Sequence, residues 1–164
     1  MNGYLIDSNI LINSNRYYRQ QFFPVVWQFY LQTPDLYMLD RVYAELVSKD
    51  DSLGKWTKAN YKPKLISADE SLSEYREVNH YLSQSKLWTP AGYQEWTDKM
   101  EKADPWLIVC AMKNSYTIVT DEKNTGPNGR ASDNEPKIPF VSEHFKVPTV
   151  SFWEFLKQKQ FLAQ

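Results

Sequence analysis

The stretch that decides the fold is Tyr4-Leu5-Ile6-Asp7-Ser8-Asn9-Ile10-Leu11-Ile12. A short apolar run ends abruptly on Asp7, and apolar residues resume after the polar pair Ser8-Asn9. This pattern predicts a buried parallel strand at residues 4–6, with a carboxylate at its C-terminal tip, followed by a turn into a helix. In open α/β sheets, ligands bind outside the carboxyl ends of the strands. Because a carboxylate at that place lowers stability unless it binds something, Asp7 is the first candidate functional residue.

The rest of the chain alternates between strand-like and helix-like segments, which is typical of an α/β fold. Pro24 predicts a break or a second start within the first helical segment, and Asp40 is suited to cap the helix that begins after it. Two polar stretches, residues 50–63 and 122–139, are expected to be connections, the second of them a long loop. The expected strands are residues 4–6, 36–39, 64–67, 117–120 and 147–152, and the expected helices are residues 10–31, 41–49, 69–85, 90–101, a segment from 104 onward, and 153–161.

Length, charge and cysteine content narrow the class of protein. The 164 residues predict a single domain, residues 1–164, which is long enough to bury a core. A net charge of −1 gives no global signature of nucleic-acid binding, so contact with RNA or DNA has to use local patches. The single cysteine, Cys110, excludes an intrachain disulfide and a cysteine-based metal site. Neither a signal peptide nor a run of about 20 apolar residues is visible, so we expect a cytoplasmic protein without a membrane span.

Three further acids stand in settings comparable to that of Asp7. Asp121 ends the strand 117–120, Asp104 lies at a helix start, and Glu45 lies about one turn into the helix after the second strand. Hard oxygen ligands of this kind suit Mg²⁺ or Mn²⁺, and two such ions about 4 Å apart promote phosphodiester hydrolysis. Two carboxylates about 4 Å apart repel by roughly 4 kcal/mol at an effective dielectric constant near 20, so we expect at least one raised pKa without a cation.

Each acid also has a purely structural interpretation. Asp104 before Pro105 makes a good N-cap, Glu45 reads as an exposed helical acid, and Asp121 reads as a turn residue. Asp7 is the hardest of the four to explain by structure alone, because it ends an apolar strand.

With these four acids in place, the chain resembles the PIN-domain ribonucleases, and in particular the VapC-like toxins. The fold implied by this resemblance is a Rossmann-like three-layer α/β/α sandwich with a central parallel sheet. The implied activity is Mg²⁺- or Mn²⁺-dependent cleavage of RNA, and the implied partners are a cognate antitoxin and a second copy in a homodimer. The segments that carry the resemblance are Tyr4–Leu11, Val42–Leu46, Ala103–Ala111 and Ile118–Glu122, and the Ala103–Ile108 block is more typical of an uncharacterised PIN branch than of VapC toxins.

The resemblance also assigns roles to individual residues. The acidic quartet matches Asp7, Glu45, Asp104 and Asp121, which would serve as catalytic and metal-binding residues. The supporting polar positions match Ser8, Asn9 and Thr120. Glu122 directly follows Asp121, so the fourth acid is ambiguous between the two; we favour Asp121 because it ends the strand.

Two other functions stay open at this point. One is a metal-dependent phosphohydrolase or DNA nuclease, since Asp7-Ser8-Asn9 resembles the start of a phosphatase nucleophile motif. In that motif a second Asp stands where this chain has Asn9, which counts against it. The other is a non-catalytic PIN-like binding module, although such a module has no need to keep all four acids.

Substrate and partner contacts are expected from cations and aromatic residues. Lys55, Lys58 and Lys62 alternate with Trp56 and Tyr61 in a segment that suits RNA phosphates and stacked bases, although a solvated turn over the core explains it equally well. Three cations of the long loop, which is expected to run past Asp121, are further candidates for contact with a nucleic-acid backbone: Lys123, Arg130 and Lys137. Ordinary loop solubility also explains them.

The aromatic content exceeds what one small sheet needs for its core. The residues concerned are Phe22, Phe23, Trp27, Tyr30 and the Trp88–Trp96 region. A dimer interface or a groove for an antitoxin segment would use this surplus.

Overall fold

The computed structural model describes residues 2–123 and 134–164 of the chain. These residues form a five-stranded sheet in the order β3-β2-β1-β4-β5, and every neighbouring pair of strands is parallel. The α/β class and the parallel sheet expected from the sequence are therefore confirmed. The strands are β1 (Tyr4–Ile6), β2 (Leu36–Leu39), β3 (Leu65–Ile66), β4 (Thr117–Val119) and β5 (Thr149–Val150).

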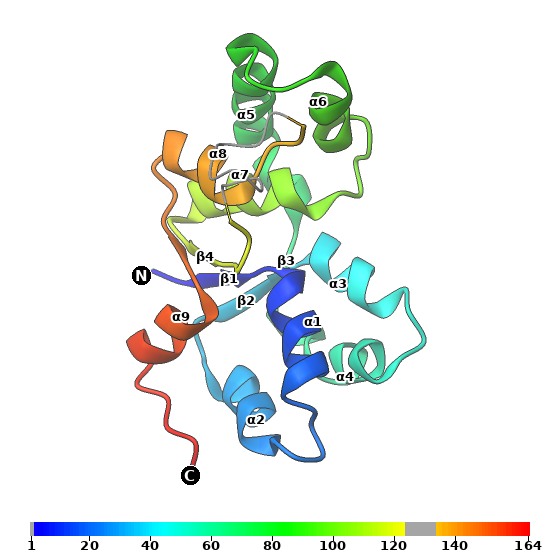
Figure 1. The fold of residues 1–164 in the computed structure, drawn as a ribbon, viewed down its shortest axis with the longest axis vertical. Helices are drawn as coiled ribbons and strands as arrows, with labels where there is room; N and C mark the ends of the chain where they lie inside the picture. The colour runs from blue at the N-terminus through cyan, green and yellow to red at the C-terminus, as the bar shows by residue number, and fades with distance from the viewer. Residues whose placement is uncertain (1, 124–133) are drawn as a thin grey trace.

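Helices cover both faces of the sheet, as the three-layer expectation required (Figure 1). One layer holds α5 (Leu72–Ser85), α6 (Pro90–Thr97), α7 (Ala103–Asn114) and α8 (Ile138–His144). The other holds α1 (Ser8–Tyr17), α2 (Pro24–Gln32), α4 (Ser52–Asn60) and α9 (Phe152–Gln158), while α3 (Asp40–Val47) contacts both α4 and α7. Two short 3₁₀ turns, η1 (Lys62–Lys64) and η2 (Ala68–Ser71), flank β3. No helix among the described residues is long and apolar enough to cross a membrane.

The helical segment expected at residues 10–31 is two helices rather than one. The first, α1, ends at Tyr17, and α2 begins at Pro24. A proline in the first turn of a helix costs no hydrogen bond, whereas within a helix it removes one, so Pro24 starts a new helix. Asp40 is the first residue of α3 rather than its cap, and its carboxylate instead accepts a hydrogen bond from the backbone N–H of Ala68 at 3.2 Å.

Two helices lie where the sequence predicted none. In the polar segment 50–63, Asp51 caps α4 by accepting a hydrogen bond from the backbone N–H of Gly54 at 2.7 Å. The polar composition of α4 concealed an inward face at helical spacing, on which Leu53 and Thr57 are buried. The second unexpected helix is α8, which begins at the end of the expected loop.

The strand order places a topological switch point beside the central strand. From β1 the chain adds β2 and then β3 on one side, and later returns to add β4 and β5 on the other side of β1. The carboxyl ends of β1 and β4 therefore flank a crevice, which is where ligands of open parallel sheets bind. The backbone N–H of Asp7 donates to the carbonyl of Val119 at 2.9 Å and holds the two ends side by side.

The aromatic surplus divides between the core and the surface. Trp27, Tyr30 and Trp96 are buried and belong to the core. Phe22 and Phe23 stay exposed in the segment between α1 and α2.

Candidate active site

Asp7 is held at the switch point by hydrogen bonds to residues at the end of β4. Its side chain is only 5% exposed, and its Oδ2 accepts a hydrogen bond from the hydroxyl of Thr120 at 2.8 Å. Burial raises the pKa of Asp7 from 3.8 to about 6, helped by the negative charges of Glu122 and Glu45 and opposed by the Thr120 hydrogen bond. A buried carboxyl group with acidic neighbours is typical of a functional site.

Thr120 joins the two strand ends through one hydroxyl group. Besides donating to Asp7, this oxygen accepts from the side-chain amide of Asn9 at 3.3 Å and from the backbone N–H of Glu122 at 3.1 Å. The Asn9 side chain in turn accepts from the backbone N–H of Asp121 at 3.3 Å. The polar residues expected to support the site therefore lie directly around Asp7.

Asp104 reaches the same crevice from the other layer. It is the second residue of α7, whose N-cap is Lys102, so it is not the helix cap that one interpretation of the sequence expected. Its side chain is 24% exposed. Burial raises the pKa of Asp104 from 3.8 to about 7, with further increases from Asp7 and Glu122 and a decrease from Lys102, whose ammonium lies 4.0 Å away.

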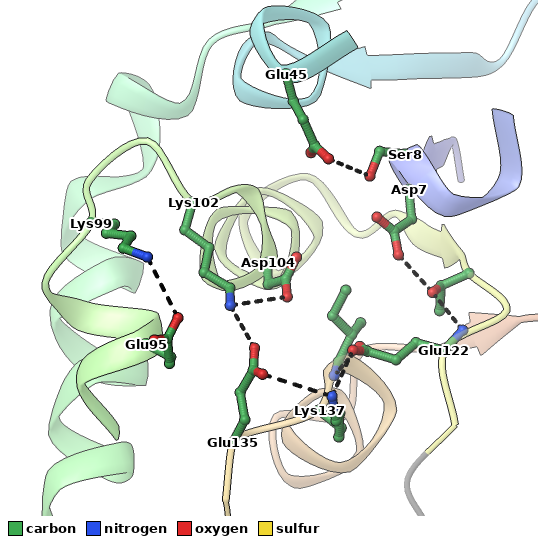
Figure 2. A network of polar contacts seen from close by, with 12 residues as sticks. Asp7, Ser8, Glu45, Glu95, Lys99, Lys102, Asp104, Glu122, Glu135 and Lys137 are labelled. Carbon is green, nitrogen blue, oxygen red and sulfur yellow. Dashed lines mark hydrogen bonds and ion pairs between the residues drawn. The ribbon is translucent and has the colours of Figure 1, made fainter. Parts of the chain in front are cut away.

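Glu45 approaches from α3 and is the most exposed member of the group. Its carboxylate accepts a hydrogen bond from the hydroxyl of Ser8 at 3.4 Å. Ser8, Glu45 and Asp104 line one cavity of about 620 Å³ between α3, α6 and the start of α7. Figure 2 shows Glu45 and Asp104 pointing toward Asp7 from two different helices.

The two consecutive acids after β4 point in different directions. The Asp121 carboxylate accepts a hydrogen bond from the backbone N–H of Phe152 at 2.9 Å and so stabilises the start of α9. The Glu122 carboxylate faces the crevice, and its charge raises the pKa values of both Asp7 and Asp104. Glu122 therefore lies near Asp7 and Asp104, and its Oε2 also accepts a hydrogen bond from the backbone N–H of Ile138, the first residue of α8, at 2.8 Å. Asp121 lies at the N-terminus of α9.

Two lysines and one more acid complete the polar network. Lys102 forms an ion pair with Glu135 at 2.5 Å, and Lys137 lies 4.0 Å from Glu135 and 3.6 Å from Glu122 (Figure 2). Burial opposes ionisation of Glu135, but its contacts with the two lysines lower its pKa below the ordinary value. The ammonium groups of Lys102 and Lys137 therefore lie beside the acid cluster and offset part of its negative charge.

The donor set suits a hard cation, although these side chains do not converge on one point. Among residues 2–123 and 134–164, no group of three or more His, Cys, Asp or Glu side chains is close enough to hold a single metal ion. The donors at the crevice are nevertheless all carboxylate oxygens, the class that Mg²⁺ and Mn²⁺ prefer. The raised pKa values of Asp7 and Asp104 mean that positive charge placed between them is stabilising.

Among the described residues, the cations expected to touch RNA are not part of the lining of the 620 Å³ cavity at Asp104. Lys55 and Lys58 are exposed on α4, and Lys55 pairs with Asp50 at 3.5 Å. Lys62 is exposed in η1, and Lys123 is exposed after β4. Arg130 lies outside the described residues.

Sequence reasoning missed Lys102 and Glu135 as members of the site. Lys102 stands two positions before Asp104, and a cation so close to a candidate acid was a usable signal. Glu135 lies 33 residues from Lys102 along the chain, and no local pattern links the two. Lys137 was expected only as a loop cation near a nucleic-acid backbone, not as a partner of Glu122.

Comparison with known proteins shows which family the chain belongs to. A family described as "Domain of unknown function (DUF4411)" matches residues 4–162. The chain belongs to this family. No curated protein matches this DUF4411 chain.

Solved structures show which fold this DUF4411 chain has. A chain of VapBC2 from Rickettsia felis, bound to a DNA fragment from its promoter, has a TM-score of 0.52 at 14% identity, covering 90% of this chain and 97% of that one. A chain of FitAcB from Neisseria gonorrhoeae has a TM-score of 0.51 at 18% identity, covering 92% and 98%. A chain of FitAB bound to the IR36 DNA fragment has a TM-score of 0.52 at 17% identity, covering 92% and 95%. The fold shared with these neighbours is the PIN fold, so the fold implied by the resemblance is confirmed.

Proposed function

We propose that this DUF4411 protein is a metal-dependent endoribonuclease and the toxin of a toxin–antitoxin pair. The observation that supports it most is the gathering of four carboxylates, from Asp7, Glu45, Asp104 and Glu122, at the switch point of a PIN fold. These acids come from four separate elements, and keeping them together costs electrostatic energy that a structural role does not require. In this assignment Glu122 takes the place of Asp121 as the fourth acid.

The four carboxylates would hold Mg²⁺ or Mn²⁺. When bound, such an ion activates water and stabilises the leaving oxygen of the phosphodiester. Thr120 keeps the Asp7 carboxylate oriented through its 2.8 Å hydrogen bond. Lys102 and Lys137 supply positive charge beside the acids, which lowers the repulsion felt by an incoming phosphate group.

A protein partner is supported by the neighbours and by an exposed aromatic face. VapBC and FitAB are toxin–antitoxin complexes, and in this chain Phe22 is 68% and Trp153 65% exposed beside Phe23 and Tyr18. Exposed aromatic side chains that cluster in this way mark contact surfaces. We assign this face to the binding of an antitoxin. We also propose that the protein acts in the cytoplasm, where its RNA substrate is found.

The activity is tested by incubating a mixed single-stranded RNA pool with the purified protein, with and without Mg²⁺ or Mn²⁺. We expect metal-dependent cutting that Asp104→Asn abolishes and Asp98→Asn, an exposed control at the end of α6, leaves unchanged. Absence of cutting by folded, metal-supplied protein would contradict the proposal. Cutting of DNA or of small phosphoesters in preference to RNA would assign the site to another phosphodiesterase class.

The partner is tested by co-expression with the small open reading frame beside this gene. We expect a stable complex that suppresses RNA cleavage and that Phe22→Ser with Trp153→Ser disrupts. A homodimer that the same pair of substitutions breaks, with no second protein bound, would assign the aromatic face to self-association instead.

A further inference from the structure

A second cavity lies next to the acid cluster and differs from it in charge. It has a volume of about 700 Å³ and lies between the C-terminal half of α1, the segment after α1, the end of α3 and the start of α4. Figure 1 shows α1, α3 and α4 grouped on one side of the molecule. Glu45 lines both this cavity and the 620 Å³ cavity at Asp104, so the two share a wall at a candidate catalytic residue.

The cations of the second cavity are not paired with acids. Arg16, Arg19 and Lys49 line it, and none of them forms an ion pair with any residue that the structure describes. Two acids also line the cavity, Glu45 and Asp51, and the Asp51 carboxylate accepts the capping hydrogen bond from the backbone N–H of Gly54. The cavity is therefore lined by three cations without ion-pair partners among the described residues and by two carboxylates, so its lining carries a net positive charge.

The cations on the other side of Glu45 are already committed. Arg41 pairs with Asp40 and lies over the ring of Trp106 at 4.3 Å, and Lys102 pairs with Glu135. In the same cavity Lys99 pairs with Glu95 at 3.6 Å. Among the described residues lining the two cavities, positive charge is thus available to a ligand on the Arg16 side.

Close packing fixes the walls of this cavity. A Cβ at Gly54 would lie 2.3 Å from the carbonyl oxygen of Lys49 and 2.9 Å from that of Leu46, so glycine allows α4 to abut the end of α3. Across the cavity, the hydroxyl of Ser52 donates to the side-chain oxygen of Asn15 at 3.2 Å and ties α4 to α1. Lys49 and Arg16 are therefore presented from rigidly joined elements.

We propose that this cavity binds backbone phosphates of an RNA strand on one side of the bond to be cut. This inference rests on the proposed nuclease function, because it places the scissile phosphate at the acids and the adjoining phosphates at Arg16, Arg19 and Lys49. It adds that the substrate is a polynucleotide, because the cations and Asp104 line two different cavities that have only Glu45 in common among the described residues.

The test measures binding separately from cleavage. A fluorescein-labelled single-stranded RNA of mixed sequence is titrated with the Asp104→Asn protein in EDTA, and anisotropy is followed over a range of salt concentrations. The site variant adds Arg16→Gln, Arg19→Gln and Lys49→Gln. The matched control adds the same charge change on other surfaces through Arg76→Gln, Lys86→Gln and Lys157→Gln.

We expect the site variant to bind at least about tenfold more weakly at low salt, with a salt slope smaller by about 2, because each lost phosphate contact on a single strand removes about 0.7. The control should stay within about twofold. Equal losses in both variants, or a loss in neither, would overturn the assignment of the cavity.

Cleavage assays then separate the two proposals. They use proteins that keep Asp104, with and without the three cavity substitutions. With Mg²⁺, the three substitutions should slow the cutting of RNA and leave unchanged the hydrolysis of a small activated phosphodiester. If the wild-type protein cuts RNA but the site variant binds it normally, the cavity proposal fails and the nuclease stands. If the wild-type protein binds RNA through these cations but cuts nothing, the nuclease fails and the cavity stands.

Discussion

Replacing Asp7 by asparagine should stabilise the metal-free protein. The carboxyl group is 5% exposed, and its pKa is raised from 3.8 to about 6, chiefly by burial. At a pH well above both values, the difference corresponds to about 3 kcal/mol of destabilisation, because one pKa unit is worth about 1.4 kcal/mol. An asparagine oxygen can still accept the Thr120 hydrogen bond, but the new amide group needs partners of its own. We therefore expect a net gain of about 1–3 kcal/mol near pH 8.

The pH dependence of this gain follows from proton linkage. Below about pH 3 the Asp7 carboxyl is protonated in both the folded and the unfolded chain, so it contributes no difference. Between about pH 4 and about pH 6 the folded protein keeps the proton that the unfolded chain loses, so wild-type stability falls as the pH rises. Above about pH 6 the full cost is present. The advantage of Asp7→Asn should therefore shrink to about half near pH 5 and vanish near pH 3.

The measurement is urea unfolding in EDTA at several pH values for wild type, Asp7→Asn and the control Asp50→Asn. Asp50 is 93% exposed and makes only a surface ion pair, so its substitution should change stability by less than about 1 kcal/mol. An Asp7→Asn protein that is less stable than wild type near pH 8, or whose gain does not depend on pH, would refute the reasoning. Asp7 would then be a structural residue.

Three further experiments probe the site and its surroundings. Glu122→Gln should lower the pKa of Asp7 and abolish metal-dependent cleavage, whereas Asp121→Asn, which keeps an acceptor for the start of α9, should retain most activity; carboxyl titration by NMR and an RNA cleavage assay test this, and the reverse ranking would restore Asp121 as the fourth acid. Gly54→Ala should destabilise the protein by about 1–3 kcal/mol or more, because its Cβ would meet the Lys49 carbonyl oxygen at 2.3 Å; urea unfolding checks this, and a change under about 0.5 kcal/mol contradicts the close packing of α3 and α4. Adding Mg²⁺ should raise the melting temperature of wild type and not of Asp7→Asn, and an equal shift in both proteins would place the ion elsewhere.

The features that could be predicted from the sequence are those set by local patterns. The strand before Asp7 is a short apolar run that stops at a charged residue, and the strand 117–119 repeats this pattern. The sheet and the acids at the ends of these two strands could therefore be predicted. The helix α4 was missed because its inward residues are few and one of them is Thr57, a polar side chain that donates to the carbonyl of Leu53 inside the helix. Hydrophobic periodicity carries no signal where a buried position is polar.

The choice between Asp121 and Glu122 shows a different limit. Consecutive residues in extended backbone point to opposite sides, so only one of the two can face the crevice. Which one does so depends on where α9 begins, because its first backbone N–H groups attract the Asp121 carboxylate. That information lies about 30 residues downstream of the strand and is not contained in the local motif.

The hydrogen bond between Thr120 and Asp7 joins residues 113 positions apart in the chain. Until β4 has been synthesised and inserted beside β1, Asp7 has no hydroxyl to orient it, and Glu122 is absent altogether. Protein synthesis proceeds from the N-terminus, so a ribosome carrying this chain holds an incomplete set of acids for roughly the first three quarters of translation. Under the proposed nuclease function, a chain built in this order has no complete set of acids with which to cut its own messenger or ribosome until β4 lies beside β1.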